Sequence, residues 1–129
     1  MVGQKRIQEE VTLTNPQVID REELMNRLDG DMELLEELFE LFVEDYPQFL
    51  ADIETAILHR DGQKLKQAAH TLKGAVGNFA AKKAFDLAFR LEMMGQEGDF
   101  QDAEPVFRDL NRAVEEIKEA LAAMKREPV

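Results

Sequence analysis

Apolar residues recur every three or four positions through most of this 129-residue chain, which is the spacing of one face of an α-helix. The longest run holds this spacing from Leu35 to Ile57 and passes through Pro47 without a change of period. A proline that leaves the period intact is expected to kink a helix rather than end it. No segment shows the alternation of a β-strand, and no segment repeats another. The pattern therefore predicts an all-α protein.

Turn signals divide this pattern into five segments. The expected helices cover residues 19–28, 31–60, 63–79, 81–96 and, from 100 or 102, a last segment to 124. Asp20 is a candidate N-cap, and the pairs Asp29-Gly30 and Asp61-Gly62 separate the first three helices. Four long amphipathic helices with short connections favour an antiparallel up-and-down four-helix bundle, and the short first helix is expected to cover one end.

The bundle is expected to span residues 19–126, and residues 1–18 are interpreted as a flexible arm or linker because they show no period. One stripe of each helix should supply the core. In the third helix the stripe contains Leu65, Ala68, Leu72, Val76 and Phe79, and in the fourth it contains Phe85, Ala88, Leu91 and either Met93 or Met94. Gly95 and Gly98 are expected to end the fourth helix.

The composition excludes several classes of function. The chain has no cysteine, so it forms neither disulfides nor thiolate metal sites, and this suits a reducing cytoplasm. Its formal charge of −11 argues against nucleic-acid binding and against contact with anionic membranes. No apolar stretch is long enough for a transmembrane helix or a signal sequence. We therefore expect a soluble, cytoplasmic domain.

Basic residues are concentrated between residues 61 and 90, where six of them stand against two acidic residues. The rest of the chain is strongly acidic. Scattered lysines usually mean a solvated helix face, but these lysines share their segment with His70. The segment is therefore interpreted either as a solvated face or as a docking surface for an acidic partner.

His70 lies on the side of its predicted helix that faces away from the apolar stripe. At about 100° per residue it is about 160° from the centre of that stripe. Its neighbours within roughly 60° are polar, basic or glycine, namely Gln63, Lys66, Gln67, Lys73, Gly74 and Gly77. A glycine inside a helix costs about 1 kcal/mol relative to alanine. Two glycines on an outward face therefore indicate that a partner needs access to His70.

Other sites that a helical bundle can carry are missing from the sequence. A di-metal site needs Glu-x-x-His pairs, but Gln67 and Ala56 stand three residues before the two histidines. No glycine-rich phosphate loop is present, so we expect no ATP site in this chain. The absence of serine excludes a serine nucleophile. We expect neither a cofactor nor a metal ion.

An exposed histidine with a lysine one helical turn further on suits phosphoryl transfer. Neutral imidazole is a nucleophile near pH 7, and the ring nitrogen that does not attack needs an acceptor to fix the tautomer. Lys73 shares the face of His70 and can neutralise oxygens of the transferring group. Gly74 and Gly77 leave room for a partner's phosphorylated loop. His59, close to a helix end, is expected to be structural or solvated.

The region around His70 reads ELFVEDYPQFLADIETAILHRDGQKLKQ, then AAHTLKGAVGNFAA, and further on LAFRLEMMG. In this pattern, over about residues 19–125, the chain resembles the histidine-containing phosphotransfer (HPt) domains of bacterial phosphorelays and hybrid sensor kinases. The resemblance implies that His70 accepts a phosphoryl group from an aspartyl phosphate on a response-regulator receiver domain and passes it to another receiver. It also implies a sensor kinase as a partner, in the same full-length chain or apart from it, and Mg²⁺ on the receiver.

The same resemblance gives roles to residues near His70. Lys73 and Gly74 match the motif His-x-Leu-Lys-Gly, and Glu92 occupies the place where the family commonly has a Glu or Gln that bonds the imidazole. By itself Glu92 has no cation three or four positions away, so it is either an orienting acceptor or an ordinary surface glutamate. Ala80 stands where many relatives have glycine in the turn between two helices, a difference that can shift the turn.

Two alternatives to a phosphorelay intermediate stay open. The chain is either a helical adaptor whose His70 is never phosphorylated, or the substrate domain of a chemotaxis-type kinase. In the second case a separate ATP-binding domain phosphorylates His70, and the chain is part of a histidine kinase rather than a carrier.

Overall fold

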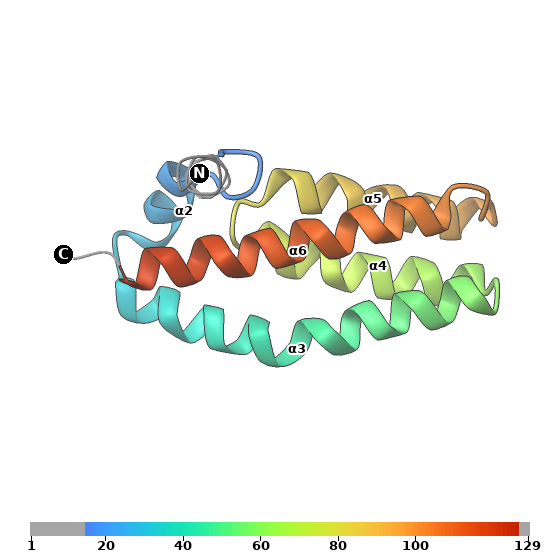
Figure 1. Ribbon diagram of the computed structural model, residues 1–129, viewed down its shortest axis with the longest axis horizontal. Coiled ribbons are helices and arrows are strands. Elements are labelled where there is room, and N and C mark those ends of the chain that lie inside the picture. The colour runs from blue at the N-terminus through green and yellow to red at the C-terminus, as the bar shows by residue number, and fades with distance from the viewer. Residues whose placement is uncertain (1–14, 127–129) are drawn as a thin grey trace, which may run out of the picture.

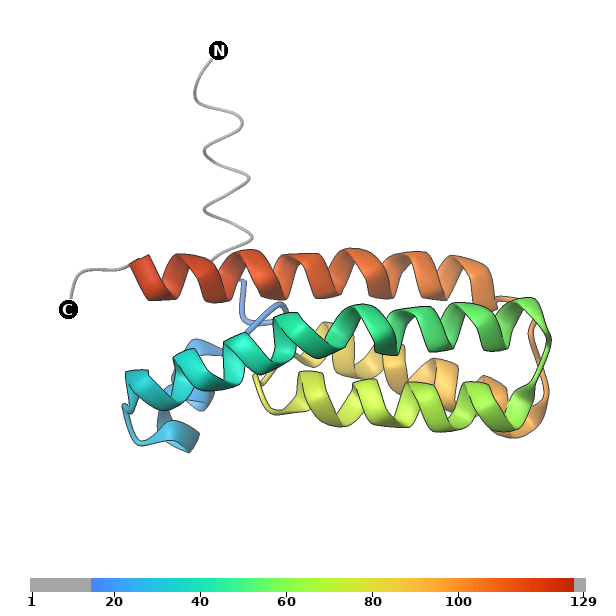
Figure 2. The same ribbon diagram turned by 90° about the horizontal axis from the view of Figure 1, so that it is seen from below.

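The computed structural model describes residues 15–126, and the regular structure within them is helical. The helices are α2 (Arg21–Leu28), α3 (Met32–Leu58), α4 (Gly62–Gly77), α5 (Lys82–Glu97) and α6 (Ala103–Arg126). Helices α3 to α6 form an antiparallel up-and-down bundle (Figure 1). At one end α3 and α6 extend past the two shorter helices, and α2 lies there (Figures 1 and 2). The predicted fold class is confirmed.

Aspartates begin three of these helices, because a carboxylate accepts hydrogen bonds from the unpaired N–H groups of a first turn. The side chains of Asp20, Asp31 and Asp61 accept such bonds at 3.0–3.1 Å. Asp29 ends α2 in a left-handed conformation with a φ of 54°. The observed starts of α2, α3 and α4 therefore lie within two residues of the predicted ones.

Helix α3 is the longest helix and contains Pro47 near its middle. The helix continues through the proline, as the unbroken apolar period predicted, and it is bowed in Figure 1. Phe42, Tyr46 and Ile53 stay buried on either side of the proline. The bend therefore leaves the core face of α3 intact.

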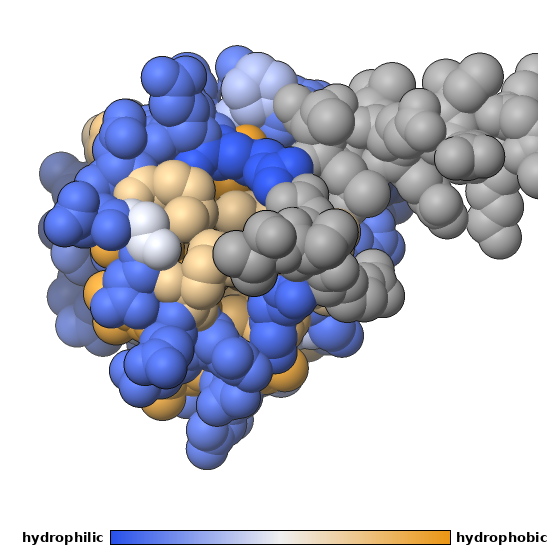
Figure 3. Space-filling view, turned by 90° about the vertical axis from the view of Figure 1, so that its left-hand side faces the viewer, coloured by the Kyte–Doolittle hydropathy of each residue, from blue (hydrophilic) through white to orange (hydrophobic). Residues whose placement is uncertain are grey.

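Helix α2 covers the end of the bundle where α4 and α5 stop short. Leu24 and Leu28 are buried, and the Arg27 guanidinium donates a hydrogen bond of 2.7 Å to the carbonyl oxygen of Gly77 at the end of α4. Figure 3 looks at this end and shows a hydrophobic patch surrounded by hydrophilic side chains. Met32, the first residue of α3, is 41% exposed.

Helices α4 and α5 approach closely because small residues meet at their contact. A Cβ added to Gly62 would lie 2.6 Å from the carbonyl oxygen of Gly95. A Cβ added to Gly95 would lie 2.6 Å from the backbone nitrogen of Lys66. Real Cβ atoms do not approach backbone atoms this closely. Both positions therefore require glycine for the two backbones to touch.

The structure corrects three predictions about the core. Gly95, one of the two glycines expected to end α5, is buried within the helix, whereas Gly98 follows its last residue, Glu97, as the C-cap. Phe85, expected to face inward, is 38% exposed and lies against Gly77 of α4. The residues that α5 buries include Ala84 and Ala88 instead. In α4, Ala68, expected in the buried stripe, is only half-buried, and Ala69 is fully buried in its place.

The segment before α2 belongs to the packed domain. Val18 and Ile19 are buried, and the carbonyl oxygen of Gln17 accepts a hydrogen bond of 2.9 Å from the N–H of Lys83. Helix α5 has no side-chain cap at Ala81, so the Gln17 carbonyl supplies a partner for its first turn. The boundary predicted at residue 19 therefore falls inside a packed segment. The rest of the predicted arm, residues 1–14, lies outside the described residues.

Ala80 forms the turn between α4 and α5 with a φ of 54°, a conformation that glycine adopts easily. An alanine there costs about 1–2 kcal/mol. The residue is buried, and its carbonyl oxygen accepts a hydrogen bond of 3.0 Å from the N–H of Asp20. These contacts hold the turn in the left-handed conformation although the residue is not glycine.

Charge is divided unequally between neighbouring helices. Helix α3 carries eight carboxylates and neither lysine nor arginine, whereas α4 carries three lysines and no carboxylate. In Figure 1 α3 and α5 lie at opposite edges of the bundle.

Within residues 15–126 no helix is both long enough and apolar enough to cross a membrane.

Candidate functional site

His70 is on the outer face of α4, where the helical spacing placed it. Its side chain is 67% exposed, whereas Ala69 and Leu72 on the same helix are fully buried. Because Ala69 and Leu72 are packed in the core, the rotation of α4 about its axis is fixed. The opposite face of α4, with the imidazole, is therefore turned to solvent.

Glu92 of α5 faces His70 across the contact between the two helices. Its Oε1 atom lies 3.2 Å from Nδ1 of His70. An ionised carboxylate can only accept, so Nδ1 is the donor in this pair and Nε2 carries the free lone pair. Glu92 is 14% exposed, so the carboxylate is largely shielded while the ring it holds is not. This is the geometry of an orienting acceptor.

Lys73 bonds the same carboxylate oxygen as His70. Its Nζ atom lies 2.9 Å from Oε1 of Glu92, and its side chain is only 17% exposed. Glu92 has no cation three or four positions away on its own helix, but it is paired, because the cation comes from α4. The Lys73 ammonium points toward α5 and is already paired, rather than extending into solvent beside His70.

The pKa of the Glu92 carboxyl is set by opposing effects. Burial is the largest single one and raises the pKa. The hydrogen bonds from Lys73 and His70, together with the charges of these two residues, lower it. Their sum prevails, so the pKa of Glu92 lies below its ordinary value of 4.5. Glu92 is therefore ionised at neutral pH and available as an acceptor.

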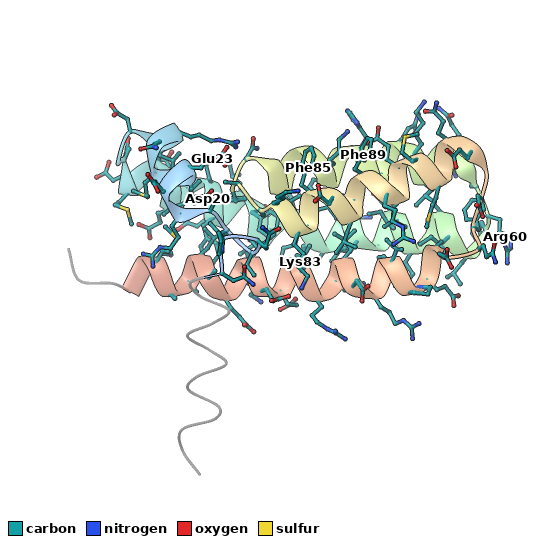
Figure 4. The ribbon with its side chains drawn as sticks, turned by 90° about the horizontal axis from the view of Figure 1, so that it is seen from above. Asp20, Glu23, Arg60, Lys83, Phe85 and Phe89 are labelled. Atoms are coloured by element: carbon teal, nitrogen blue, oxygen red, sulfur yellow. The ribbon has the colours of Figure 1, made fainter. Side chains whose placement is uncertain are left out.

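Two aromatic residues that sequence reasoning did not place at the site border Lys73. Its Nζ atom lies 5.0 Å from the ring centre of Phe89 and 5.8 Å from that of Phe85. Both residues are on α5, one turn apart, and are 45% and 38% exposed (Figure 4). The small residues Ala84, Ala88 and Gly95 recur at helical spacing and mark the buried side of α5. This series could have indicated that Phe85 and Phe89, each one position further along the chain, lie at the edge of that side.

The four residues proposed for partner access differ in their surroundings. Gly74 is exposed, and a Cβ added there would meet nothing within 4 Å. Gly77 is half-buried, and a Cβ there would lie 3.4 Å from the Phe85 ring, so this glycine does not face open solvent. Gln67 is exposed, whereas Lys66 is half-buried where its backbone approaches Gly95.

His59 takes no part in the contacts that join His70, Lys73 and Glu92. It follows the last residue of α3 as its C-cap and is exposed. It borders a groove between α3 and α4 that Gln67 and Thr71 also line. Among residues 15–126, no three His, Asp or Glu side chains gather in a way that would hold a metal ion.

The comparisons with known proteins agree with the site. No curated protein and no solved structure matches the chain. The family model of the Hpt domain matches residues 37–126, which include α4, α5 and α6 in full. That range contains His70, Lys73 and Glu92, the three residues that meet at the contact of α4 and α5. The chain therefore belongs to the Hpt domain family, whose members are phosphotransfer domains of phosphorelays.

Proposed function

We propose that this domain is a phosphorelay intermediate, in which Nε2 of His70 accepts a phosphoryl group from the aspartyl phosphate of one receiver domain and passes it to another. The observation that carries the proposal is the contact of 3.2 Å between Nδ1 of His70 and Oε1 of Glu92. It keeps the proton on Nδ1 and leaves Nε2, on a ring that is 67% exposed, as the nucleophile.

The transfer needs no base from this chain. The lone pair of Nε2 forms a bond to phosphorus, the bond between phosphorus and the aspartyl oxygen breaks, and the aspartate leaves as a carboxylate on the receiver. The imidazole ring becomes positively charged while Nδ1 keeps its proton. Ionised Glu92 accepts that proton's hydrogen bond and stabilises the charge. The reverse sequence passes the phosphoryl group on, and any Mg²⁺ required is expected on the receiver.

The face around His70 supports docking of a receiver. Gly74 leaves the helix backbone open beside the ring. The exposed rings of Phe85 and Phe89 provide apolar surface on α5, and α4 contributes lysines without any carboxylate. This combination fits the rim of a receiver's acidic phosphorylation pocket.

The test is transfer of labelled phosphate. Receiver domains from the same genome would be phosphorylated with acetyl phosphate and Mg²⁺, freed of the donor and mixed with the chain. We expect an acid-labile, base-stable adduct on the chain. It should be absent from His70→Gln and present in His59→Gln, which serves as the matched control because it removes the other histidine. ATP alone should give no adduct.

The outcomes separate the proposal from its alternatives. Label that persists in His70→Gln contradicts the assignment of the phosphoacceptor. Label that comes only from ATP and the catalytic domain of a kinase, and from no phosphorylated receiver, identifies a kinase substrate domain. Absence of label from every donor, in a protein whose fold is intact by circular dichroism, identifies an adaptor.

A further inference from the structure

We propose that Phe85 and Phe89 are positioning residues, which hold the Lys73 ammonium on Glu92 and thereby fix the orientation of the His70 imidazole. Only the consequence of this inference for the rate of transfer depends on the proposed function. The clamp itself, defined as Lys73 between these two rings and Glu92, belongs to the unphosphorylated protein and can be tested there.

The first argument is the contrast between two side chains on one helix. His70 and Lys73 lie one turn apart on α4, yet the His70 side chain is 67% exposed and that of Lys73 only 17%. A lysine on an open helix face normally extends its ammonium into water and keeps its conformational freedom. Something therefore holds Lys73 against α5.

The second argument is the position of the two rings. Phe85 and Phe89 are one turn apart on α5, and the Lys73 Nζ atom lies within 6 Å of both ring centres, at 5.8 and 5.0 Å. An aromatic face attracts an ammonium at this range and also shields it from water. The rings remain partly exposed themselves, so core packing is not their main role.

The third argument is that the Phe85 ring lies directly against α4. A Cβ on Gly77 would lie 3.4 and 3.6 Å from carbon atoms of the Phe85 ring, which is ordinary van der Waals contact. The ring therefore packs on α4 one turn after Lys73, beside the ammonium that it borders.

The fourth argument links the clamp to His70. Lys73 and His70 bond the same oxygen, Oε1 of Glu92, at 2.9 and 3.2 Å. If the carboxylate rotates, both contacts break together. A lysine held by aromatic rings therefore fixes the rotamer of Glu92, and Glu92 in turn fixes the imidazole.

The test uses nuclear magnetic resonance on the unphosphorylated chain with the variants Phe85→Leu, Phe89→Leu and the double variant. Phe89→Tyr keeps an aromatic ring. Phe39→Leu is the matched control, because the Lys125 ammonium lies 5.1 Å from the Phe39 ring and pairs with Glu36 at 3.4 Å. These residues lie on α3 and α6, and neither helix contains a histidine. The measurements are the carboxyl titration of Glu92, the Nζ resonance of Lys73 and the ring nitrogen shifts of His70.

We expect the double variant to reduce the population of clamped Lys73 by roughly 2- to 30-fold, the range that corresponds to a lost cation–π interaction. The Glu92 titration should then move up toward 4.5, and the share of the Nδ1–H tautomer should fall. Phe89→Tyr should retain the wild-type values, and Phe39→Leu should leave them unchanged. Because both rings are exposed, the melting temperature should change little.

The inference is overturned if the double variant has the wild-type titration and tautomer while Lys73→Met changes both. In that case the lysine needs no rings to reach Glu92. If the clamp behaves as expected but no receiver ever labels His70, the proposed function fails and the clamp stands. If His70 is labelled but the titration of the double variant is unchanged, the clamp is refuted and the proposed function stands.

Discussion

The same substitution should have opposite effects at two helical glycines of this domain. Gly74→Ala adds a methyl group on α4 where nothing lies within 4 Å. The gain is the difference in helix propensity, about 0.5–1 kcal/mol. For a domain of this size that corresponds to a rise in melting temperature of roughly 2–6 °C.

Gly95→Ala makes the same chemical change on α5 but meets backbone. The new Cβ would lie 2.6 Å from the carbonyl oxygen of Gly62 and 2.6 Å from the nitrogen of Lys66. Neither atom can rotate away, so α4 and α5 must separate. Overpacking of this kind costs about 1–3 kcal/mol, which exceeds the gain in propensity. We expect a net loss of about 1–2 kcal/mol.

Denaturant unfolding followed by circular dichroism measures both effects, and phosphotransfer adds a functional readout. Gly74→Leu should keep the fold and slow transfer, because its bulk stands beside His70. A destabilised Gly74→Ala would show that this face of α4 is packed rather than open. An unaffected Gly95→Ala would show that the two helices can move apart at no cost, and the reasoning about their contact would be wrong.

Two further predictions concern the N-terminal segment and the acid limb of stability. Ile19→Ala should lower the free energy of unfolding by about 2–4 kcal/mol, because Ile19 is 2% exposed. Gln17→Ala should have little effect, because Gln17 bonds α5 through its main chain. Denaturant titrations that show equal losses for the two variants would contradict this. The pKa of Glu92 is lowered by folding, so its ionisation adds stability above pH 4.5 that is lost as the pH falls through the lowered pKa. The difference in the free energy of unfolding between wild type and Glu92→Gln should therefore shrink in acid. If this difference is the same at pH 7 and at pH 3.5, ionised Glu92 does not stabilise the fold.

The helices were predictable because their apolar period and their caps are local. Asp20, Asp31 and Asp61 act within three residues of themselves, so the sequence alone locates the helix starts. The outward position of His70 is equally local, since it depends only on the phase of one helix.

The pairing of side chains between helices was not predictable in this way. Lys73 and Glu92 are 19 positions apart, and whether they meet depends on how closely α4 and α5 pack. Gly62 and Gly95 let the two backbones touch at one end of this contact, but the helix propensity of glycine indicates only that it disfavours a helix. Ala84 and Phe85 both stand at helical spacing from buried Ala88, and the sequence pattern favours the more hydrophobic Phe85 for the core, whereas the structure buries Ala84.

The unequal charge of α3 and α4 gives this small domain an electric polarity across its width. Eight carboxylates on one helix repel an approaching anion, and three lysines on the next attract it. At physiological salt this field extends over about 8 Å, further than any hydrogen bond. We therefore expect a negatively charged body to approach from the side of α4 rather than that of α3, and we expect this orientation of the first encounter to weaken as salt is added.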